Sequence, residues 1–313
     1  MIEFFKRLFR RGPAAPPPPG AAAAPPPPGE GAIHELPVPG SEVVTAPLKP
    51  LKISAGGGAR LRLAHAQSVG VVRDHNEDVL LTITTTFEGD ERIPTFGLYI
   101  VADGMGGHNM GERASAVAAR SVANEVVRKV YISMLSLDEA DSRPPLQDIL
   151  QEALTEANRA VVQSVGEGGT TLTVALALND QVVIGHVGDS RAYFIAQNTV
   201  EQLTRDHSLV RRLQELGQLS PAEAAVHPQR NVLYRAVGQG DGLEVDVHSH
   251  RLSPGMKILL CSDGLWGLVS DAQIAEIVRS SSTLQAACDR LVEAANEAGG
   301  PDNITAVLVE YLP

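Results

Sequence analysis

The sequence is poor in cysteine, has no long uncharged apolar run and carries no excess of positive charge. Its only cysteines, Cys261 and Cys288, have no second cysteine or histidine at metal-ligand spacing, which argues against a zinc site and a disulfide framework. No window approaches the roughly 18 apolar residues of a membrane span. The first residues also lack the uncharged core of a secretory signal, so we expect the folded part in the cytoplasm.

The charge is negative, with 37 Asp and Glu against 26 Lys and Arg and a net charge of −11. Residues 1–59 carry a net +2, which leaves −13 on the remainder. A nucleic-acid partner would require clustered Lys and Arg, so none is expected. An acidic body instead suits a site that collects cations. We expect a monomer.

The N-terminal part predicts two segments ahead of a folded domain. Residues 1–12 mix apolar and basic side chains that a short helix could sort onto two sides, for contact of residues 1–11 with an anionic membrane surface or a partner protein. The alternative is a disordered terminus, because so short a helix is marginal in water. Residues 13–59 are rich in Pro, Ala and Gly and predict a linker without a core of its own.

From about residue 60 to 313 the pattern predicts one α+β domain. Short apolar runs alternate with turn residues, and apolar residues at three- and four-residue spacing predict three helices, within 114–130, 146–161 and 284–295. Several strands follow one another by short turns, which favours a mostly antiparallel sheet system over a Rossmann alternation. The predicted strands are 96–102, 172–178, 182–187, 192–195, 257–261 and 304–311.

Aspartates follow the ends of several strand-like runs. Asp103-Gly104, Asp189-Ser190 and Asp263-Gly264 each come directly after an apolar run, while Asp302-Asn303 precedes the last one and Glu77-Asp78 closes an earlier polar stretch. A single Asp-Gly pair is usually a turn. Several converging carboxylates would repel one another unless cations neutralise them, and hard oxygen ligands select Mg²⁺ or Mn²⁺.

These motifs together resemble the metal-dependent 2C-type protein serine/threonine phosphatases in their bacterial form. The similarity runs from about residue 62 to 311, in the family's order and approximate spacing. The motifs are Arg73-x-x-Asn76-Glu77-Asp78, Ala102-Asp103-Gly104-Met105-Gly106-Gly107, Gly169-Thr170-Thr171, Gly188-Asp189-Ser190-Arg191, Ser262-Asp263-Gly264 and Asp302-Asn303.

The resemblance implies a fold and a set of ligands. The fold would be two packed antiparallel β-sheets, a β-sandwich, flanked by α-helices on both sides. Two or three Mn²⁺ or Mg²⁺ ions would be held, with Asp103 bridging two of them. Asp263 and Asp302 would complete the shell of one ion, Glu77 and the carbonyl of Gly104 would serve the other, and Asp189 with Asp263 would hold a third.

The resemblance also implies the reaction. A water bridging two cations would attack phosphoserine or phosphothreonine directly, while the guanidinium of Arg73 binds the phosphate. Many eukaryotic relatives have a histidine, their proposed general acid, where this chain has Met105. His108 is one substitute to test, although a loop histidine is more often structural. The substrates would be phosphorylated proteins, and the enzyme would oppose a bacterial Ser/Thr kinase in signal transduction.

The segment 205–237 resembles the family's flap beside the active site. His207, Arg211 and Arg230 are candidate substrate contacts there, although the arginines could equally be solvated helix charges. Two rival functions remain at this point. One is a noncatalytic module that kept the fold, which would normally have lost a ligand. The other is a phosphatase dedicated to one small anti-sigma-type regulator.

Overall fold

The computed structural model describes residues 60–87, 93–106, 109–136, 144–196 and 199–312. The chain divides into two units, residues 1–47 and 48–313, and all described residues belong to the second. The predicted segments 1–12 and 13–59 lie outside the described residues.

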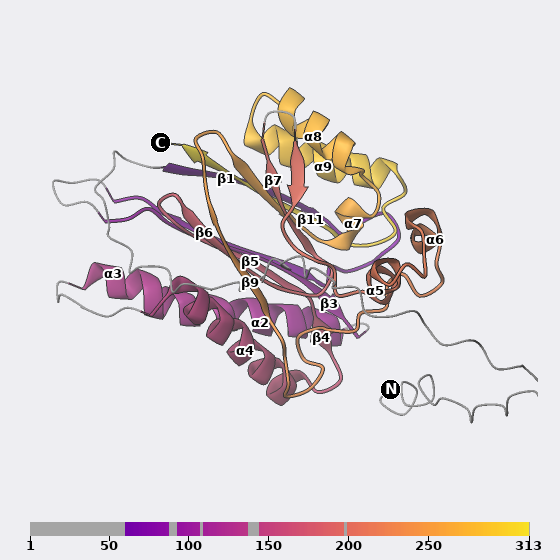
Figure 1. Cartoon of the computed structure of the whole chain (residues 1–313), viewed down its shortest axis with the longest axis horizontal. Coiled ribbons are helices and arrows are strands. Elements are labelled where there is room, and N and C mark those ends of the chain that lie inside the picture. The colour runs from indigo at the N-terminus through magenta and orange to yellow at the C-terminus, as the bar shows by residue number, and fades with distance from the viewer. Residues whose placement is uncertain (1–59, 88–92, 107–108, 137–143, 197–198, 313) are drawn as a thin grey trace, which may run out of the picture. The chain divides into compact units, whose positions relative to one another are not determined.

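Two antiparallel sheets form the centre of this unit (Figure 1). The first sheet joins the first and last strands of the domain, since β1 and β11 pair along nine residues from Arg60 opposite Leu312 to Ser68 opposite Ile304. In spatial order its strands are β1 (Arg60–Ser68), β11 (Ile304–Leu312), β10 (Lys257–Cys261), β7 (Arg191–Ile195) and β8 (Val200–Gln202).

The second sheet has β3 near its middle, and the short β4 pairs with the end of that strand. All its pairings are antiparallel; a two-residue turn joins β5 to β6, whereas β3 and β5 pair across the helices α2–α4 and β6 and β9 pair across β7, β8, α5 and α6. Its strands are β2 (Asp78–Thr85), β3 (Phe96–Met105), β5 (Leu172–Leu178), β6 (Gln181–Val187) and β9 (Asp246–Arg251), with β4 (Gly169–Thr170) beside β3.

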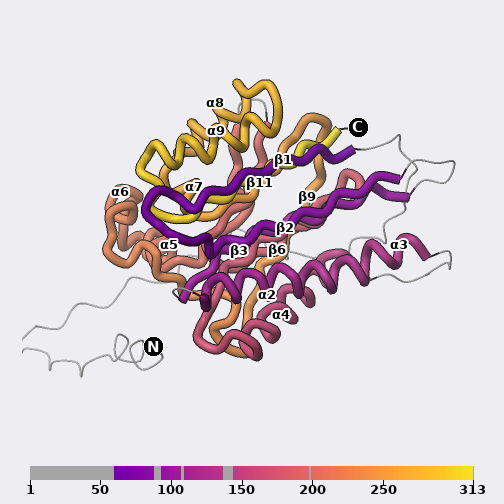
Figure 2. Tube along the Cα trace, turned by 180° about the vertical axis from the view of Figure 1, so that it is seen from behind, coloured from indigo at the N-terminus to yellow at the C-terminus, as the bar shows by residue number. Residues whose placement is uncertain are grey.

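Helices cover the outer face of each sheet, and the reverse view in Figure 2 shows the same two helical layers. The second sheet is covered by α2 (Asn109–Val126), the π-helical turn η1 (Val127–Ile132), α3 (Ser133–Leu135) and α4 (Leu146–Val165). The first sheet is covered by α7 (Asp263–Trp266), α8 (Asp271–Ser280) and α9 (Leu284–Glu297). Two short helices, α5 (Leu209–Glu215) and α6 (Pro221–Ala225), belong to the segment between β8 and β9.

Apolar side chains form three clusters, one between each pair of adjacent layers. Tyr99, Leu260 and Val307 belong to the cluster between the two sheets, which draws on both of them. On α2, Ala114, Ala118 and Val122 recur every four residues and face the second sheet, which is why this stretch buries one stripe as a helix. The order of layers is therefore helix, sheet, sheet, helix.

The predicted fold class is confirmed, and so are the six predicted strands and three helices. One boundary differs because β3 continues through Asp103 and Gly104 to Met105, pairing with β4 beyond the apolar run. Among the described residues, no helix is both long enough and apolar enough to span a bilayer.

Candidate metal and phosphate site

A cavity of about 260 Å³ lies where several strands end, and seven of the ten predicted site residues line it. Asp103 and Gly104 come from the end of β3, Asp263 follows β10, and Asp302 precedes β11. The residues that line the cavity are Arg73, Glu77, Asp103, Gly104, Met105, Gly106, Thr171, Asp189, Asn231, Leu233, Asp263 and Asp302.

Asp103 is held by the backbone around it. Its N–H donates to the hydroxyl of Thr171 at 2.9 Å, while its carbonyl accepts from the N–H of Thr171 and the hydroxyl of Thr170, each at 2.9 Å. These bonds connect β3 to the β4–β5 region. They fix the direction in which the Asp103 carboxylate projects into the cavity.

Gly104 lies where β3 meets the start of α2. A Cβ built on Gly104 would stand 2.3 Å from the carbonyl oxygen of Gly111 and 2.7 Å from that of Glu77, so no larger residue fits without movement. The N–H of Gly104 donates to the Glu77 carbonyl at 3.2 Å, and the Ser115 hydroxyl donates to the same oxygen at 2.7 Å. Glycine at 104 therefore brings Glu77 and Asp103 to neighbouring positions.

The buried carboxylates raise one another's pKa. Burial, followed by repulsion from neighbouring aspartates, raises the pKa of Asp103 well above its usual value. The same two causes raise the pKa of Asp189, and Arg191 opposes the shift only in part. Burial and the charge of Asp302 raise the pKa of Asp263 to about 6, although a hydrogen bond with Asp103 acts the other way. A cluster with these shifts gains stability from any positive charge brought into it.

Asp78 lies behind the cavity and supports the strands that carry it. Its Oδ2 accepts hydrogen bonds from the hydroxyls of Ser262 at 2.7 Å and Thr305 at 2.6 Å. Burial, only partly offset by these two bonds, raises its pKa to about 7. Asp78 thus connects β2 to the residues that follow β10 and begin β11.

Asn303 is a supporting residue that sequence reasoning did not single out. Its side-chain amide donates to the carbonyls of Val69 and His75, both at 2.9 Å, and its Oδ1 accepts from the N–H of Glu77 at 2.8 Å. One side chain thus holds the loop that contains Arg73 and Glu77. The only signal in the sequence was its place directly after Asp302.

Arg73 lies at the cavity and forms an ion pair there. Its Nη2 is 2.8 Å from Oδ2 of Asp302, and both side chains are partly exposed, at 45% and 33%. The other carboxylate oxygen of Asp302 accepts from the N–H of Asn303 at 2.9 Å. The predicted phosphate ligand and a predicted metal ligand are therefore partners in this structure.

The three predicted flap residues do not line the cavity. His207 is buried, where its Nδ1 accepts from the N–H of Gly188 at 3.0 Å and its Nε2 lies 3.2 Å from Asp246. Arg211 lies 3.4 Å from Glu215, and Arg230 is exposed.

The same segment instead contributes Asn231 and Leu233 to the cavity, two residues that sequence reasoning missed. Neither belongs to a periodic pattern. Met105 lines the cavity as its position implied, whereas His108 lies outside the described residues.

The donor set fits hard divalent cations. Oε1 of Glu77 is buried and makes no hydrogen bond with the described residues, although Nε2 of His75 lies 3.5 Å away. Carboxylates and backbone carbonyls are the ligands that Mg²⁺ and Mn²⁺ prefer. Among the described residues, no three His, Cys, Asp or Glu side chains already stand arranged as ligands of one ion. Both carboxylate oxygens of Asp302 already have partners, Arg73 and the N–H of Asn303.

Comparison with known proteins agrees with this geometry. The family model described as "Protein phosphatase 2C" matches residues 66–304. The serine/threonine phosphatase stp of Listeria innocua is 38% identical over 247 residues, covering 77% of this chain and 92% of that protein.

Solved structures give the same result. The chain resembles the serine/threonine phosphatase PstP/Ppp of Mycobacterium tuberculosis at a TM-score of 0.67 and 32% identity, covering 81% of this chain and 99% of that one. It also resembles the catalytic domain of PstP in complex with two manganese ions, at a TM-score of 0.65 and 30% identity, covering 82% and 100%.

The fold, the cavity and the family match define one class of protein. The fold has two sheets between helical layers, the carboxylate cavity lies at the strand ends, and the match extends across most of the chain. The chain belongs to the protein phosphatase 2C family. It is a protein serine/threonine phosphatase, and metal dependence is general to its family.

Proposed function

We propose that this cavity hydrolyses phosphoserine and phosphothreonine in proteins by direct attack of water, using two or three Mn²⁺ or Mg²⁺ ions. The supporting observation is that Arg73, Glu77, Asp103, Asp189, Asp263 and Asp302, from five separate parts of the chain, line one cavity. The cations, when bound, supply positive charge that lowers the pKa of water and offsets charge on the phosphoryl oxygens.

The protein side chains divide the remaining work. Glu77, Asp103, Asp263, Asp302 and the carbonyl of Gly104 would hold the two principal ions, and Asp189 with Asp263 a third. Their raised pKa values favour this assignment, because a cation relieves the repulsion that causes the shifts. No described Ser or Cys takes the place of a nucleophile, since among the described residues only Thr171 adds a hydroxyl to the cavity lining.

Arg73 would bind the phosphate through its planar guanidinium, which matches two phosphoryl oxygens. Its present partner Asp302 is a predicted metal ligand, so binding of cation and phosphate would redirect both side chains together. Asn231 and Leu233 would contact the substrate around the phosphorylated residue, because both line the cavity.

The biological setting extends the same proposal. Residues 60–313 would be the catalytic domain, residues 13–59 a linker, and residues 1–12 a short segment for membrane or protein contact. The enzyme would work in the cytoplasm and oppose a bacterial Ser/Thr kinase. The named relatives are bacterial serine/threonine phosphatases, which supports this setting.

The test is release of phosphate from a phosphothreonine peptide and from a phosphorylated kinase activation loop. We expect activity that requires Mn²⁺ or Mg²⁺, is abolished by chelation, and is lost in Asp103→Asn. Acid quenching with ³²P-labelled substrate should trap no phosphoenzyme. A stable labelled enzyme, or full turnover in chelator, would contradict the mechanism. Turnover of many unrelated phosphopeptides would separate a general enzyme from one dedicated to a single regulator.

A further inference from the structure

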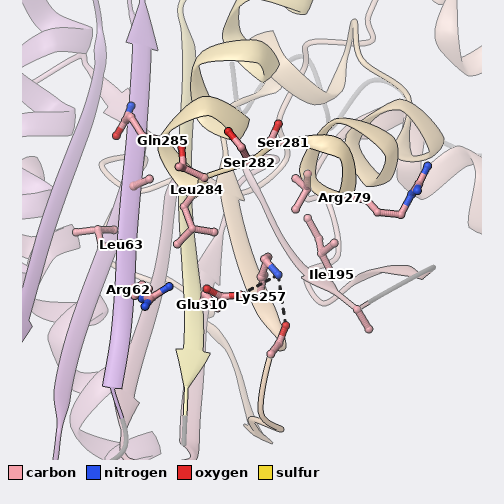
Figure 3. Close-up of a pocket in the computed structure, with 15 residues that line it drawn as sticks. Arg62, Leu63, Ile195, Lys257, Arg279, Ser281, Ser282, Leu284, Gln285 and Glu310 are labelled. Carbon is pink, nitrogen blue, oxygen red and sulfur yellow. Dashed lines mark hydrogen bonds and ion pairs between the residues drawn. The ribbon is translucent and has the colours of Figure 1, made fainter.

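Figure 3 shows a second cavity, of about 790 Å³. It lies at the opposite end of the first sheet from the carboxylate site. It is lined near the start of β1 and β10 and near the end of β7 and β11, whereas the carboxylate site lies at the other ends of these strands. Glu310 follows Asp302 by eight residues of extended chain, which is roughly 26 Å at about 3.3 Å per residue. The volume is in the range of about 300–1,000 Å³ found for ligand sites.

The floor of this cavity is a charged row across three strands. Arg62 on β1 and Lys257 on β10 are both register partners of Glu310 on β11. The ammonium of Lys257 lies 3.0 Å from the Glu310 carboxylate, and Arg62 is exposed beside them. The row therefore has two cations to one carboxylate. Among these three described residues only Lys257 and Glu310 form an ion pair, and the row keeps a positive charge on a domain that is otherwise strongly acidic.

The opposite wall comes from the connection between α8 and α9. Figure 3 shows Ser281, Ser282 and Leu284 above the charged row. Ser282 is exposed, while Leu284 packs against the apolar cluster of the first sheet. Arg279 also lines the cavity, although it pairs with Glu276. The site thus places a positive floor beside a wall that combines hydroxyl groups with the aliphatic side chain of Leu284.

We propose that this distal groove binds an acidic, aliphatic segment of the phosphoprotein substrate, well removed in sequence from the phosphorylated residue. Carboxylates of the segment would pair with Arg62 and Lys257, and its aliphatic side chains would contact Leu284 and Ile195. Charge complementarity selects this occupant. The row has two cations, Arg62 and Lys257, and one carboxylate, Glu310, and a basic or neutral segment would bring no negative charge to balance the second cation. This inference rests on the proposed function only in taking the bound segment to be part of a phosphoprotein substrate.

Two bound points on one substrate would raise affinity without altering the chemistry. A flexible Gly-Ser spacer of about 20 residues has an average span of roughly 25 Å, which matches the separation of the two sites. The distal groove would therefore lower KM for suitable substrates and leave kcat unchanged. Salt would reduce the effect, because both partners are exposed charges.

The first measurement is direct binding. A fluorescein-labelled hexapeptide of alternating glutamate and leucine, without phosphate, is titrated with the full chain at low salt and followed by anisotropy. The control peptide replaces glutamate with glutamine. We expect the acidic peptide to bind at least about fivefold more tightly than the control, and 0.5 M salt to remove the difference.

The second measurement is kinetic. The same hexapeptide is joined through a 20-residue Gly-Ser spacer to a phosphothreonine peptide, and its KM is compared with that of the glutamine version. We expect a KM about fivefold lower for the acidic version at equal kcat.

Two variants locate the effect. Arg62→Gln removes the exposed cation of the row, and Ser282→Glu adds an opposing charge on an exposed residue, where no packing is lost. Both should abolish the preference for the acidic peptide in binding and in KM, with unchanged kcat/KM for the short phosphopeptide. Arg120→Glu is the matched control, since Arg120 is exposed on α2 beyond the other sheet.

Equal binding of the two hexapeptides by the wild-type chain would overturn the proposal, and so would a preference that survives in both groove variants. Loss of the preference in Arg120→Glu would also overturn it, because the effect would then follow overall charge. Binding of the hexapeptide can be measured by anisotropy even if the chain has no phosphatase activity. Failure of the proposed function and failure of the groove are therefore distinguishable.

Discussion

The guanidinium of Arg73 and the carboxylate of Asp302 face each other at 2.8 Å, although 229 residues separate them in the chain. In the proposed mechanism Arg73 would bind the phosphate and Asp302 a cation. The ion pair holds the two side chains at the cavity, and it would then compete with both proposed ligands.

Replacing Arg73 by alanine should move metal affinity and catalysis in opposite directions. Asp302 would lose a partly exposed partner worth at most about 1 kcal/mol, so we expect Mn²⁺ to bind about two- to fivefold more tightly by calorimetry. The lost phosphate contact should lower kcat/KM by roughly 10- to 100-fold. Weaker Mn²⁺ binding in the variant would instead mean that Arg73 organises the ligand set. Arg120→Ala is the exposed control.

Asp103→Asn should inactivate the enzyme yet stabilise its metal-free form. Changes to residues that merely orient metal ligands cost about 10- to 100-fold, so loss of a direct ligand should cost about 100-fold or more. Without metal, the substitution removes one of several buried, mutually repelling carboxylates. We expect a melting temperature in chelator about 2–4 °C higher at pH 8, where repulsion is strongest. Asp180→Asn, at an exposed ion pair, should produce neither effect.

Gly104→Ala should destabilise the protein. The added Cβ would meet the backbone oxygen of Gly111 at 2.3 Å, so β3 and α2 must separate. Overpacking of this kind costs about 3 kcal/mol, which corresponds to a fall in melting temperature on the order of 10 °C. In Gly242→Ala the new Cβ has no atom within 4 Å, so that variant should melt like the wild type. Equal melting of both variants would contradict the close contact.

His186 should make the fold sensitive to acid. Burial, reinforced by His207, lowers its pKa to about 3, so the folded protein keeps this ring neutral while the unfolded chain protonates it near pH 6.5. Between about pH 6.5 and 3 the unfolded state binds more protons, and stability falls as the pH falls. In this range the free energy of unfolding falls by on the order of 1 kcal/mol per pH unit because of this group. Its ring protons, followed by NMR, should not titrate above pH 5, and a midpoint near 6 would disprove the assignment.

Local pattern was enough to predict the strands, the helices and a mostly antiparallel arrangement, whereas the two packed sheets between helical layers were expected from the family resemblance. The runs at 172–178 and 304–311 are mostly apolar, with Thr173, Thr305 and Glu310 as the exceptions, because both faces of those strands are largely buried, one by the other sheet and one by helices. The stripe of alanine and valine residues along α2 likewise predicted a helix, because these residues recur at three- and four-residue spacing. The end of β3 was not predicted, because Asp103 and Gly104 interrupt the apolar run. The strand continues through them because it pairs with β4, which is distant in the sequence.

The short motifs of the sequence predicted most of the residues that line the cavity. Ten residues within such motifs line it, seven of them predicted site residues, whereas Asn231 and Leu233 belong to a long segment that has no hydrophobic period to fix its path. His207 was misplaced for a related reason. Its burial between Gly188 and Asp246 depends on contacts 19 and 39 residues away, which no local pattern encodes.

The strand that comes last in the chain lies in the interior of its sheet, with β1 on one side and β10 on the other. During synthesis β1 therefore waits for a neighbour until almost the whole domain has been translated. Asp302 and Asn303 emerge just before that strand, so the loop that contains Arg73 and Glu77 acquires its anchor, Asn303, at the same late moment. A nascent chain that stops before Asp302 would carry most of the helices named above but would lack β11 and the residues that close the cavity, so an incomplete product could not form the site.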